Sequence, residues 1–232
     1  MKKIILSITI TCTALSLNSC ADFLNVDQYF YDMLSVDSAF SKRVYVDGWL
    51  ANNYDYMCED DLSEYGSHFQ WASDDLIHPD GKNLQQCNYS ANSFPNGDFN
   101  NHLQRCYECI RKASTFIEKV PECKEITMEE VADMQGQARF LRAFAYWSLV
   151  RTFGPVPLIP EEGLNVSLSY EELSLPRAKF DDIIDFIDHD LSMAARVLPM
   201  SRTQNNLGRP TKGAALALRA RVLLFAASPM SN

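Results

Sequence analysis

The stretch that decides the fold is Gly136–Pro160, GQARFLRAFAYWSLVRTFGPVPLIP. A helix at a protein surface needs only one apolar stripe. Here apolar side chains surround the helix axis on nearly every side: Phe140, Leu141, Phe144, Tyr146, Trp147, Leu149, Val150 and Phe153. We therefore expect other helices to pack against this one from several directions, which predicts a helical array. Gly154, Pro155 and Pro157 predict where the helix ends, because proline cannot continue it.

Apolar periodicity predicts further helices on both sides of this stretch. We place them at about Asp37–Met57, Asn100–Val120, Arg177–Leu198 and Lys212–Ala227. The capping box Thr127-Met128-Glu129-Glu130 predicts the start of the central helix, which should end near Phe153. No segment alternates apolar and polar residues for long, so strands are expected to be minor. The predicted fold class is all-α, an array of paired helices similar in architecture to tetratricopeptide repeats.

Individual side chains on these helices also have predicted surroundings. One face of the first helix should carry Phe40, Val44, Gly48 and Ala51. On the fourth helix, these aspartates are expected to face water: Asp181, Asp182, Asp185 and Asp188. Charges on a mostly buried helix need partners. For Arg139, Arg142 and Arg151 we therefore favour ion pairs to neighbouring helices over ligand binding, and we expect Trp147 in the core rather than as a ligand platform.

The amino terminus has the pattern of an export signal. Two lysines precede an apolar region, Ile4–Leu17, which is too short to span a bilayer as a helix. The region ends in Leu17-Asn18-Ser19-Cys20, which resembles the bacterial lipobox, whose cysteine is acylated after cleavage. The alternative is an ordinary secretory signal in which Cys20 is incidental. The predicted organisation is a lipoprotein signal peptide at residues 1–19, a lipid-anchored tether at 20–36 and a helical-repeat domain at 37–232.

Charge narrows the classes of partner. The formal net charge is −9, and losing Lys2 and Lys3 with the signal peptide lowers it by two to −11. Nucleic-acid binding depends on clustered lysine and arginine, so a negative chain argues against it. The same charge argues against adsorption to anionic lipid. Membrane attachment is therefore expected through acyl chains on Cys20.

Cysteines and histidines form no catalytic or metal-binding pattern. Cys106-Tyr107-Glu108-Cys109 lies inside a predicted helix and has no second C-x-x-C, unlike redox and zinc motifs. Besides Cys20, the mature chain keeps an odd number of cysteines, so a complete disulfide framework is excluded: Cys58, Cys87, Cys106, Cys109 and Cys123. The common hydrolase, zinc-protease, phosphate-loop and calcium-loop motifs are absent. We predict no enzyme, no metal site and no cofactor.

Four motifs stand in an informative order along the chain. They are the lipobox with Cys20–Leu24, Ser73–Asp75, QARFLRAF at Gln137–Phe144 running into LVRTFGPVPL, and GRPTKGAA at Gly208–Ala215 running into ARVLLFAASP. Together they resemble the SusD/RagB family of outer-membrane lipoproteins of Bacteroidetes. The resemblance covers nearly all of the mature chain, but only the amino-terminal half of what the family normally has.

The resemblance implies a cell-surface protein that captures glycans or other nutrients. In the family, such a protein caps a SusC-like TonB-dependent outer-membrane transporter and delivers cargo to it. The implied fold is all-α with tetratricopeptide-like helix pairs, truncated here before the carboxy-terminal half. The helical array usually faces the transporter, and ligand sites lie on loops and on the missing half.

The candidate ligand site lies on the long polar segment Glu59–Asn101, since glycan capture needs aromatic faces and planar polar groups. The predicted ligand-binding residues are Trp71, Asp74, Asp75, Lys82, Asn92 and Phe94, and Asn83 and Asn96 belong to the same loop. Two alternatives stay open. Trp71 and Phe94 could pack on the helices, and Asp74 and Asp75 could cap a helix or hold the loop. Adjacent carboxylates do not by themselves form the spaced pair of a glycoside hydrolase.

Two functions from different classes follow from these observations. The first is a non-enzymatic glycan-binding lipoprotein that works with a TonB-dependent transporter. The second is a lipid-anchored helical-repeat scaffold that binds only proteins, with a truncated, inactive product as a third possibility. Loss of a second half would expose apolar faces of the last two helices, so the isolated chain is expected to aggregate or to be unstable.

Overall fold

A computed structural model describes residues 36–57, 98–160, 169, 171 and 174–229 of the chain. The predicted signal peptide, Cys20 and all six predicted ligand-binding residues lie outside these ranges. The chain divides into two compact units, Met1–Ala39 and Phe40–Asn232. The described part of the first unit is the short helix α3 (Val36–Ala39).

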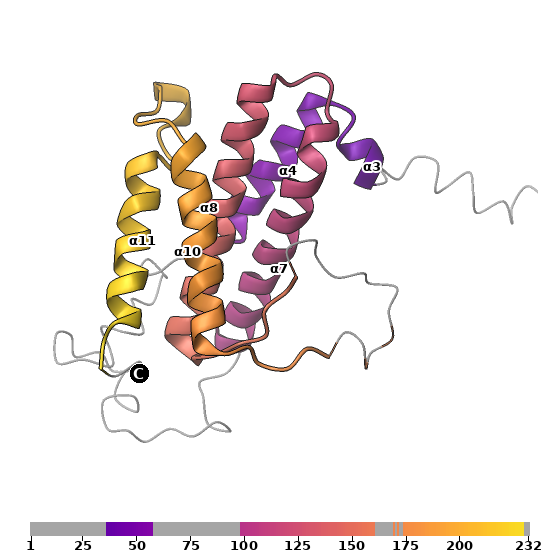
Figure 1. Cartoon of the computed structure of the whole chain (residues 1–232). Helices are drawn as coiled ribbons and strands as arrows, with labels where there is room; N and C mark the ends of the chain where they lie inside the picture. Colours follow the sequence, from indigo (N-terminus) through magenta and orange to yellow (C-terminus); the bar gives the residue numbers. More distant parts are fainter. Residues whose placement is uncertain (1–35, 58–97, 161–168, 170, 172–173, 230–232) are drawn as a thin grey trace, which may run out of the picture. The chain divides into compact units, whose positions relative to one another are not determined.

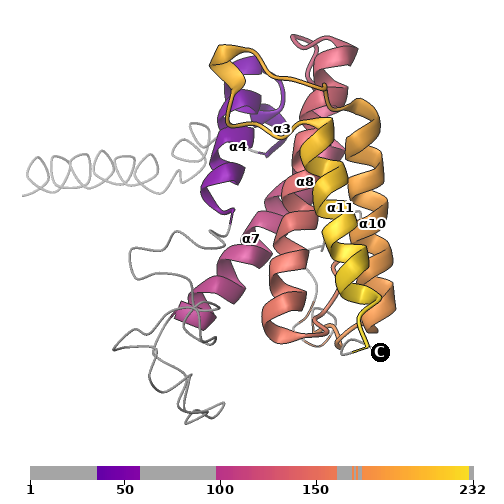
Figure 2. The ribbon, with the colours of Figure 1, turned by 90° about the vertical axis from the view of Figure 1, so that its left-hand side faces the viewer.

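The described part of the second unit is built from helices alone. They are α4 (Arg43–Asp55), α7 (Asp98–Lys119), α8 (Met128–Phe153), α10 (Phe180–Val197) and α11 (Lys212–Ala226), with short 3-10 turns η2 (Val120–Glu122) and η3 (Gln204–Asn206). Successive helices run in alternate directions, as both ribbon views show (Figures 1 and 2). Helix α8 packs mainly against α7 and α10, and to a smaller extent against α4 and α11. The all-α prediction is confirmed.

The central helix begins and ends as the sequence predicts. The Thr127 hydroxyl accepts a hydrogen bond from the backbone N–H of Glu130 at 3.3 Å, and the Glu130 carboxylate accepts one from the backbone N–H of Thr127 at 3.0 Å. Gly154 ends the helix at φ +67°, a backbone conformation that glycine adopts without steric cost. Trp147 is 2% exposed and packs edge-on against Phe225 of α11, which confirms its prediction as a core residue.

The prediction of one helix at Asp37–Met57 is wrong, because residues 40–42 interrupt it, and Phe40 does not share a face with Val44, Gly48 and Ala51. The chain turns between α3 and α4, so Phe40 lies outside the regular helix, where its ring contacts those of Trp49 and Phe116. Because α4 starts only at Arg43, its periodicity is independent of Phe40. Val44 is 67% exposed, and Gly48 and Ala51 are exposed as well. The residues of α4 that are buried are Val46, Leu50 and Asn53.

A closed charge cluster joins α7, α8 and α10 in the interior. The Asp190 carboxylate accepts hydrogen bonds from Arg142 Nε at 2.7 Å and Nη2 at 2.8 Å, and from Arg139 Nη1 at 2.8 Å. Arg142 Nη1 also donates to the Ser114 hydroxyl at 2.9 Å. The side chains of Arg142 and Asp190 are each 1% exposed. The predicted ion pairs of Arg139 and Arg142 are confirmed, while that of Arg151, which lies over the Trp147 ring, stays a prediction.

The outer surfaces of α10 and α11 differ in character. Asp181, Asp182 and Asp185 of α10 are exposed, as predicted. The prediction is wrong for Asp188, which is half-buried, because Arg219 reaches across from α11 and donates to it at 2.6 Å. Helix α11 exposes apolar side chains instead: Leu216, Leu223 and Leu224. The expected instability of the isolated chain stays a prediction.

Candidate functional site

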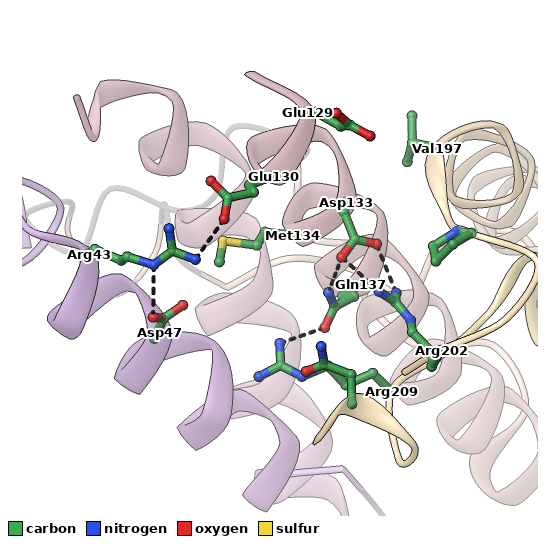
Figure 3. A pocket seen from close by; sticks show the side chains of 12 residues that line it. Arg43, Asp47, Glu129, Glu130, Asp133, Met134, Gln137, Val197, Arg202 and Arg209 are labelled. Carbon is green, nitrogen blue, oxygen red and sulfur yellow. Dashed lines mark hydrogen bonds and ion pairs between the residues drawn. The ribbon is translucent and has the colours of Figure 1, made fainter. Parts of the chain in front are cut away.

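A polar pocket lies at the end of the array where α4 and α8 begin. Its volume is about 600 Å³, which falls within the common range of small-molecule sites. The lining residues are Arg43, Asp47, Glu129, Glu130, Asp133, Met134, Gln137, Val197, Pro199, Arg202, Asn206 and Arg209. Figure 3 shows two groups of side chains in it, with Arg43 and its acidic partners on one side and the side chains of Arg202 and Arg209 on the other.

Three segments bring these side chains together. The first three turns of α8 present Glu130, Asp133 and Gln137 at spacings of three and four residues, which share a helix face, and also Glu129. The first two turns of α4 contribute Arg43 and Asp47. The connection from α10 to α11 supplies Arg202, Asn206 and Arg209. Helices α8 and α10 approach closely next to the lining residue Val197, because a methyl group on Gly136 of α8 would lie 2.6 Å from Val197 Cγ2 of α10.

On the α4 side, Arg43 holds two carboxylates. Its Nη2 donates to Glu130 at 2.7 Å, and its Nε lies 3.6 Å from Asp47. The hydrogen bond from Arg43, together with those from the backbone and hydroxyl of Thr127, lowers the pKa of Glu130 to about 2. The same pairing raises the pKa of Arg43. These charges stay ionised at neutral pH and tie the start of α4 to the start of α8.

On the other side, Asp133 and Gln137 anchor the α10–α11 connection. Arg202 donates to both oxygens of Asp133 at 2.8 Å and to the carbonyl oxygen of Pro210. The Gln137 amide nitrogen donates to Asp133 at 2.8 Å. The Gln137 carbonyl oxygen accepts from Arg209 at 3.0 Å and from the Tyr54 hydroxyl at 2.9 Å.

Burial around this network disfavours a phenolate. Desolvation raises the pKa of Tyr54, and the nearby cations Arg209 and Arg202 oppose that rise. The Tyr54 hydroxyl therefore remains protonated and serves as a hydrogen-bond donor. A donor from α4, an amide on α8 and a guanidinium before α11 thus meet at one point, which fixes the three segments relative to one another.

Sequence reasoning did not identify this pocket as a site. Gln137 and Arg209 were recognised only as members of two motifs, and these motifs, 72 residues apart, contact each other directly. The available signal was Gln137 itself, because the amide of a glutamine on a mostly buried helix needs hydrogen-bond partners. Arg43, Asp133 and Arg202 carried no signal, because charged residues at helix starts and in loops are common.

Within the described ranges, no group of three or more histidine, cysteine or acidic side chains is placed to hold a metal ion. The side chains of Cys106, Cys109 and Cys123 are buried. None of the helices that the structure describes is long and apolar enough to cross a membrane.

The fold and the pocket define a structural class of protein, an all-α array of packed helices with a polar pocket at one end. A family model described as "Starch-binding associating with outer membrane" matches residues 22–224. The chain therefore belongs to the SusD-like family, whose members associate with the outer membrane. The resemblance inferred from the sequence motifs is confirmed.

Individual relatives agree with this assignment. The chain is 29% identical over 119 residues to SusD-like protein P38 of Formosa agariphila, which covers 51% of this chain and 22% of that protein. A SusD-like protein of Bacteroides fragilis has a similar structure, with a TM-score of 0.68 and 27% identity, over 82% of this chain and 36% of that one. A laminarin-binding SusD-like protein shares the fold with a TM-score of 0.66 and 20% identity, over 80% of this chain and 40% of that one. The chain thus spans about a fifth of the curated relative and roughly two fifths of the solved structures.

Proposed function

We propose that this chain belongs to a cell-surface, lipid-anchored protein that captures oligosaccharide and passes it to a SusC-like TonB-dependent transporter. The observation that carries the proposal is the family match over residues 22–224, with its description of starch binding at the outer membrane. The shared fold with a laminarin-binding protein supports it. Binding without catalysis fits the sequence, in which no catalytic motif is found.

The proposed glycan contacts belong to the segment of sequence between α4 and α7, outside the described residues. Trp71 and Phe94 are proposed as platforms for the CH faces of sugar rings. The proposed hydrogen-bonding groups are Asp74, Asp75, Lys82 and Asn92.

Affinity electrophoresis of the whole chain through gels containing individual polysaccharides tests the proposal. Retardation by at least one neutral or acidic glycan is expected, and Trp71→Ala combined with Phe94→Ala should abolish it. Leu224→Ala serves as the matched control, since Leu224 is an exposed apolar residue of α11, 75% exposed. Binding to no member of a broad panel would contradict the proposal and favour a scaffold that binds only proteins.

The lipid anchor is tested separately. Metabolic labelling with a fatty-acid analogue should modify the wild-type chain and leave Cys20→Ala unmodified. The Cys20→Ala variant should also move from the membrane fraction to the soluble fraction, because two or more acyl chains are what holds such a protein on a bilayer. Equal membrane association of both forms would contradict anchoring through Cys20.

A further inference from the structure

Among the residues that the structure describes, the polar pocket holds one cation whose charge no carboxylate neutralises. Of its seven charged side chains, five stand in ion pairs, Arg43 with Asp47 and Glu130, and Arg202 with Asp133. The remaining two are Glu129, which is exposed, and Arg209, which is half-buried. Within the described part of the chain, the one hydrogen bond of the Arg209 guanidinium goes to the neutral amide of Gln137 at 3.0 Å.

This arrangement leaves Arg209 with unused binding capacity. A guanidinium carries five N–H donors in a planar fork, and here one of them has a protein acceptor. A partly desolvated cation without a counter-ion is unfavourable, so an anion entering the pocket gains both charge neutralisation and hydrogen bonds. The two coplanar oxygens of a carboxylate match the fork in a way that a point charge does not.

The other lining residues limit the ligand's charge and shape. The lining has four carboxylates and three guanidinium groups, so it carries one excess negative charge. This excess repels the double charge of a phosphate ester more strongly than a single charge, and a single charge can pair with Arg209. Asn206 and Asp47 offer planar polar groups that suit hydroxyls, and Met134, Val197 and Pro199 offer apolar surface that suits ring CH groups. The volume of about 600 Å³ accommodates one or two sugar rings.

We propose that this pocket binds an acidic sugar, with Arg209 as the anchor for its carboxylate. None of the residues proposed for glycan contact is among the lining residues, which come from α4, α8, the end of α10 and the α10–α11 connection (Figure 3). That the carboxylate is carried by a sugar rests on the proposed function, whereas the requirement for a carboxylate rests on Arg209 itself.

Calorimetric titration of the whole chain with glucuronate and galacturonate tests the proposal, with glucose, glucose 6-phosphate and acetate as comparison ligands. Saturable binding of at least one uronate is expected, with neutral glucose and the phosphate ester binding at least tenfold more weakly. Arg209→Gln should weaken uronate binding about tenfold or more, because a charge-assisted hydrogen bond is lost.

Two further variants separate an anchor from a structural role. Tyr54→Phe removes the other hydrogen bond to the Gln137 oxygen while keeping the guanidinium, so uronate binding should be unchanged within about twofold. Glu129→Gln removes the unpaired negative charge of the pocket and should strengthen uronate binding by about twofold. Opposite signs for Arg209→Gln and Glu129→Gln cannot arise from general loosening of the fold.

Each possible binding result supports or contradicts the assignment of this pocket as an acidic-sugar site. Equal binding of glucose and glucuronate, equal loss in Tyr54→Phe and Arg209→Gln, or binding of no uronate would overturn the inference. If acetate alone bound, the carboxylate site would stand and the sugar assignment would fail. Retardation by polysaccharides in the gel assay without uronate binding would reject this pocket and leave the proposed function intact.

Discussion

Helix α8 contributes to two clusters of arginine and acidic side chains. The clusters are similar in composition, but they differ in burial and in how completely their charges are paired. The inner cluster around Asp190 is closed, with both members of its central ion pair 1% exposed and the carboxylate satisfied by two arginines. The outer cluster surrounds a pocket open to solvent, and its charges are only partly paired. The inner ion pair joins two helices, whereas Arg202 and Arg209 of the outer cluster lie in the connection between α10 and α11.

The difference teaches how to separate a scaffold from a binding site. In the inner cluster, every donor toward Asp190 comes from a neighbouring helix, so no capacity is left for a ligand. In the outer cluster, Arg209 faces an amide rather than a carboxylate. Removing a partner should therefore cost mainly stability in the first case and mainly binding in the second.

The largest effect is expected at the inner cluster. Asp190→Ala would leave the buried Arg142 without its counter-ion, and breaking a buried pair in this way destabilises a protein by about 3–5 kcal/mol. Urea unfolding followed by circular dichroism measures the loss. Asp185→Ala, at an exposed position of the same helix, is the control and should change stability by less than about 0.5 kcal/mol. A loss below about 1 kcal/mol in Asp190→Ala would mean that the cluster does not hold the array together.

A smaller loss of stability is expected when the ion pair between Arg202 and Asp133, two residues that line the pocket, is removed. Arg202→Ala removes two hydrogen bonds to Asp133 and two to the carbonyl of Pro210, but Asp133 keeps its bond from Gln137 and is 29% exposed. We expect a destabilisation of about 2 kcal/mol in the same urea experiment, since hydrogen bonds to charged groups contribute about 1.5–3 kcal/mol. A cost equal to that of Asp190→Ala would erase the distinction between the two clusters.

The next effect concerns a neutral hydrogen bond. Tyr54→Phe deletes one donor to the Gln137 oxygen, which still accepts from Arg209. The expected loss is about 1 kcal/mol. Thermal unfolding suits this measurement, and Tyr45→Phe on the exposed side of α4 supplies a matched control. A change of 3 kcal/mol or more would show that the Tyr54 hydroxyl contributes more than one neutral hydrogen bond.

The smallest effect is a pH dependence at the outermost pair. The pKa of Glu130 is lowered to about 2, with the hydrogen bond from Arg43 as the largest cause. A depressed pKa in the folded state means that its contribution to stability is present above the unfolded value of about 4.3 and is lost as pH falls toward 2. The stability difference between wild type and Glu130→Gln should therefore shrink across this window. A difference that stays constant from pH 7 to pH 2 would contradict the assigned ion pair.

Much of the fold could be predicted from the sequence, because helix periodicity and caps are local. The start of α8 at the Thr127 capping box, its end at Gly154 and the extents of α7, α10 and α11 agree with prediction to within a few residues. The buried face of α4 could not be predicted, since it depends on a break after Phe40 that no proline or glycine marks. The partner of Asp188 was missed for a related reason: Arg219 lies on another helix.

The candidate pocket is a tertiary feature that sequence reasoning cannot locate. The pocket depends on the contacts of Arg202 with Asp133 and of Arg209 with Gln137, which are 69 and 72 positions apart in the sequence. Neither local sequence indicates its partner. The apolar pattern of α8 predicts buried, paired positions for Arg139 and Arg142, which have a structural role. Arg209 lies in a connection that has no helical periodicity, so its lack of a carboxylate partner among the described residues depends on the tertiary structure.

The most direct test of the distinction between the two clusters is a map of amide chemical shifts during titration with glucuronate. The account predicts that the shifts concentrate in three segments: the starts of α4 and α8 and the connection that carries Arg202 and Arg209. Amides around Ser114, Arg142 and Asp190 should move little. Shifts centred on the inner cluster, or none at saturating glucuronate, would contradict the assignment of the outer cluster as the binding site.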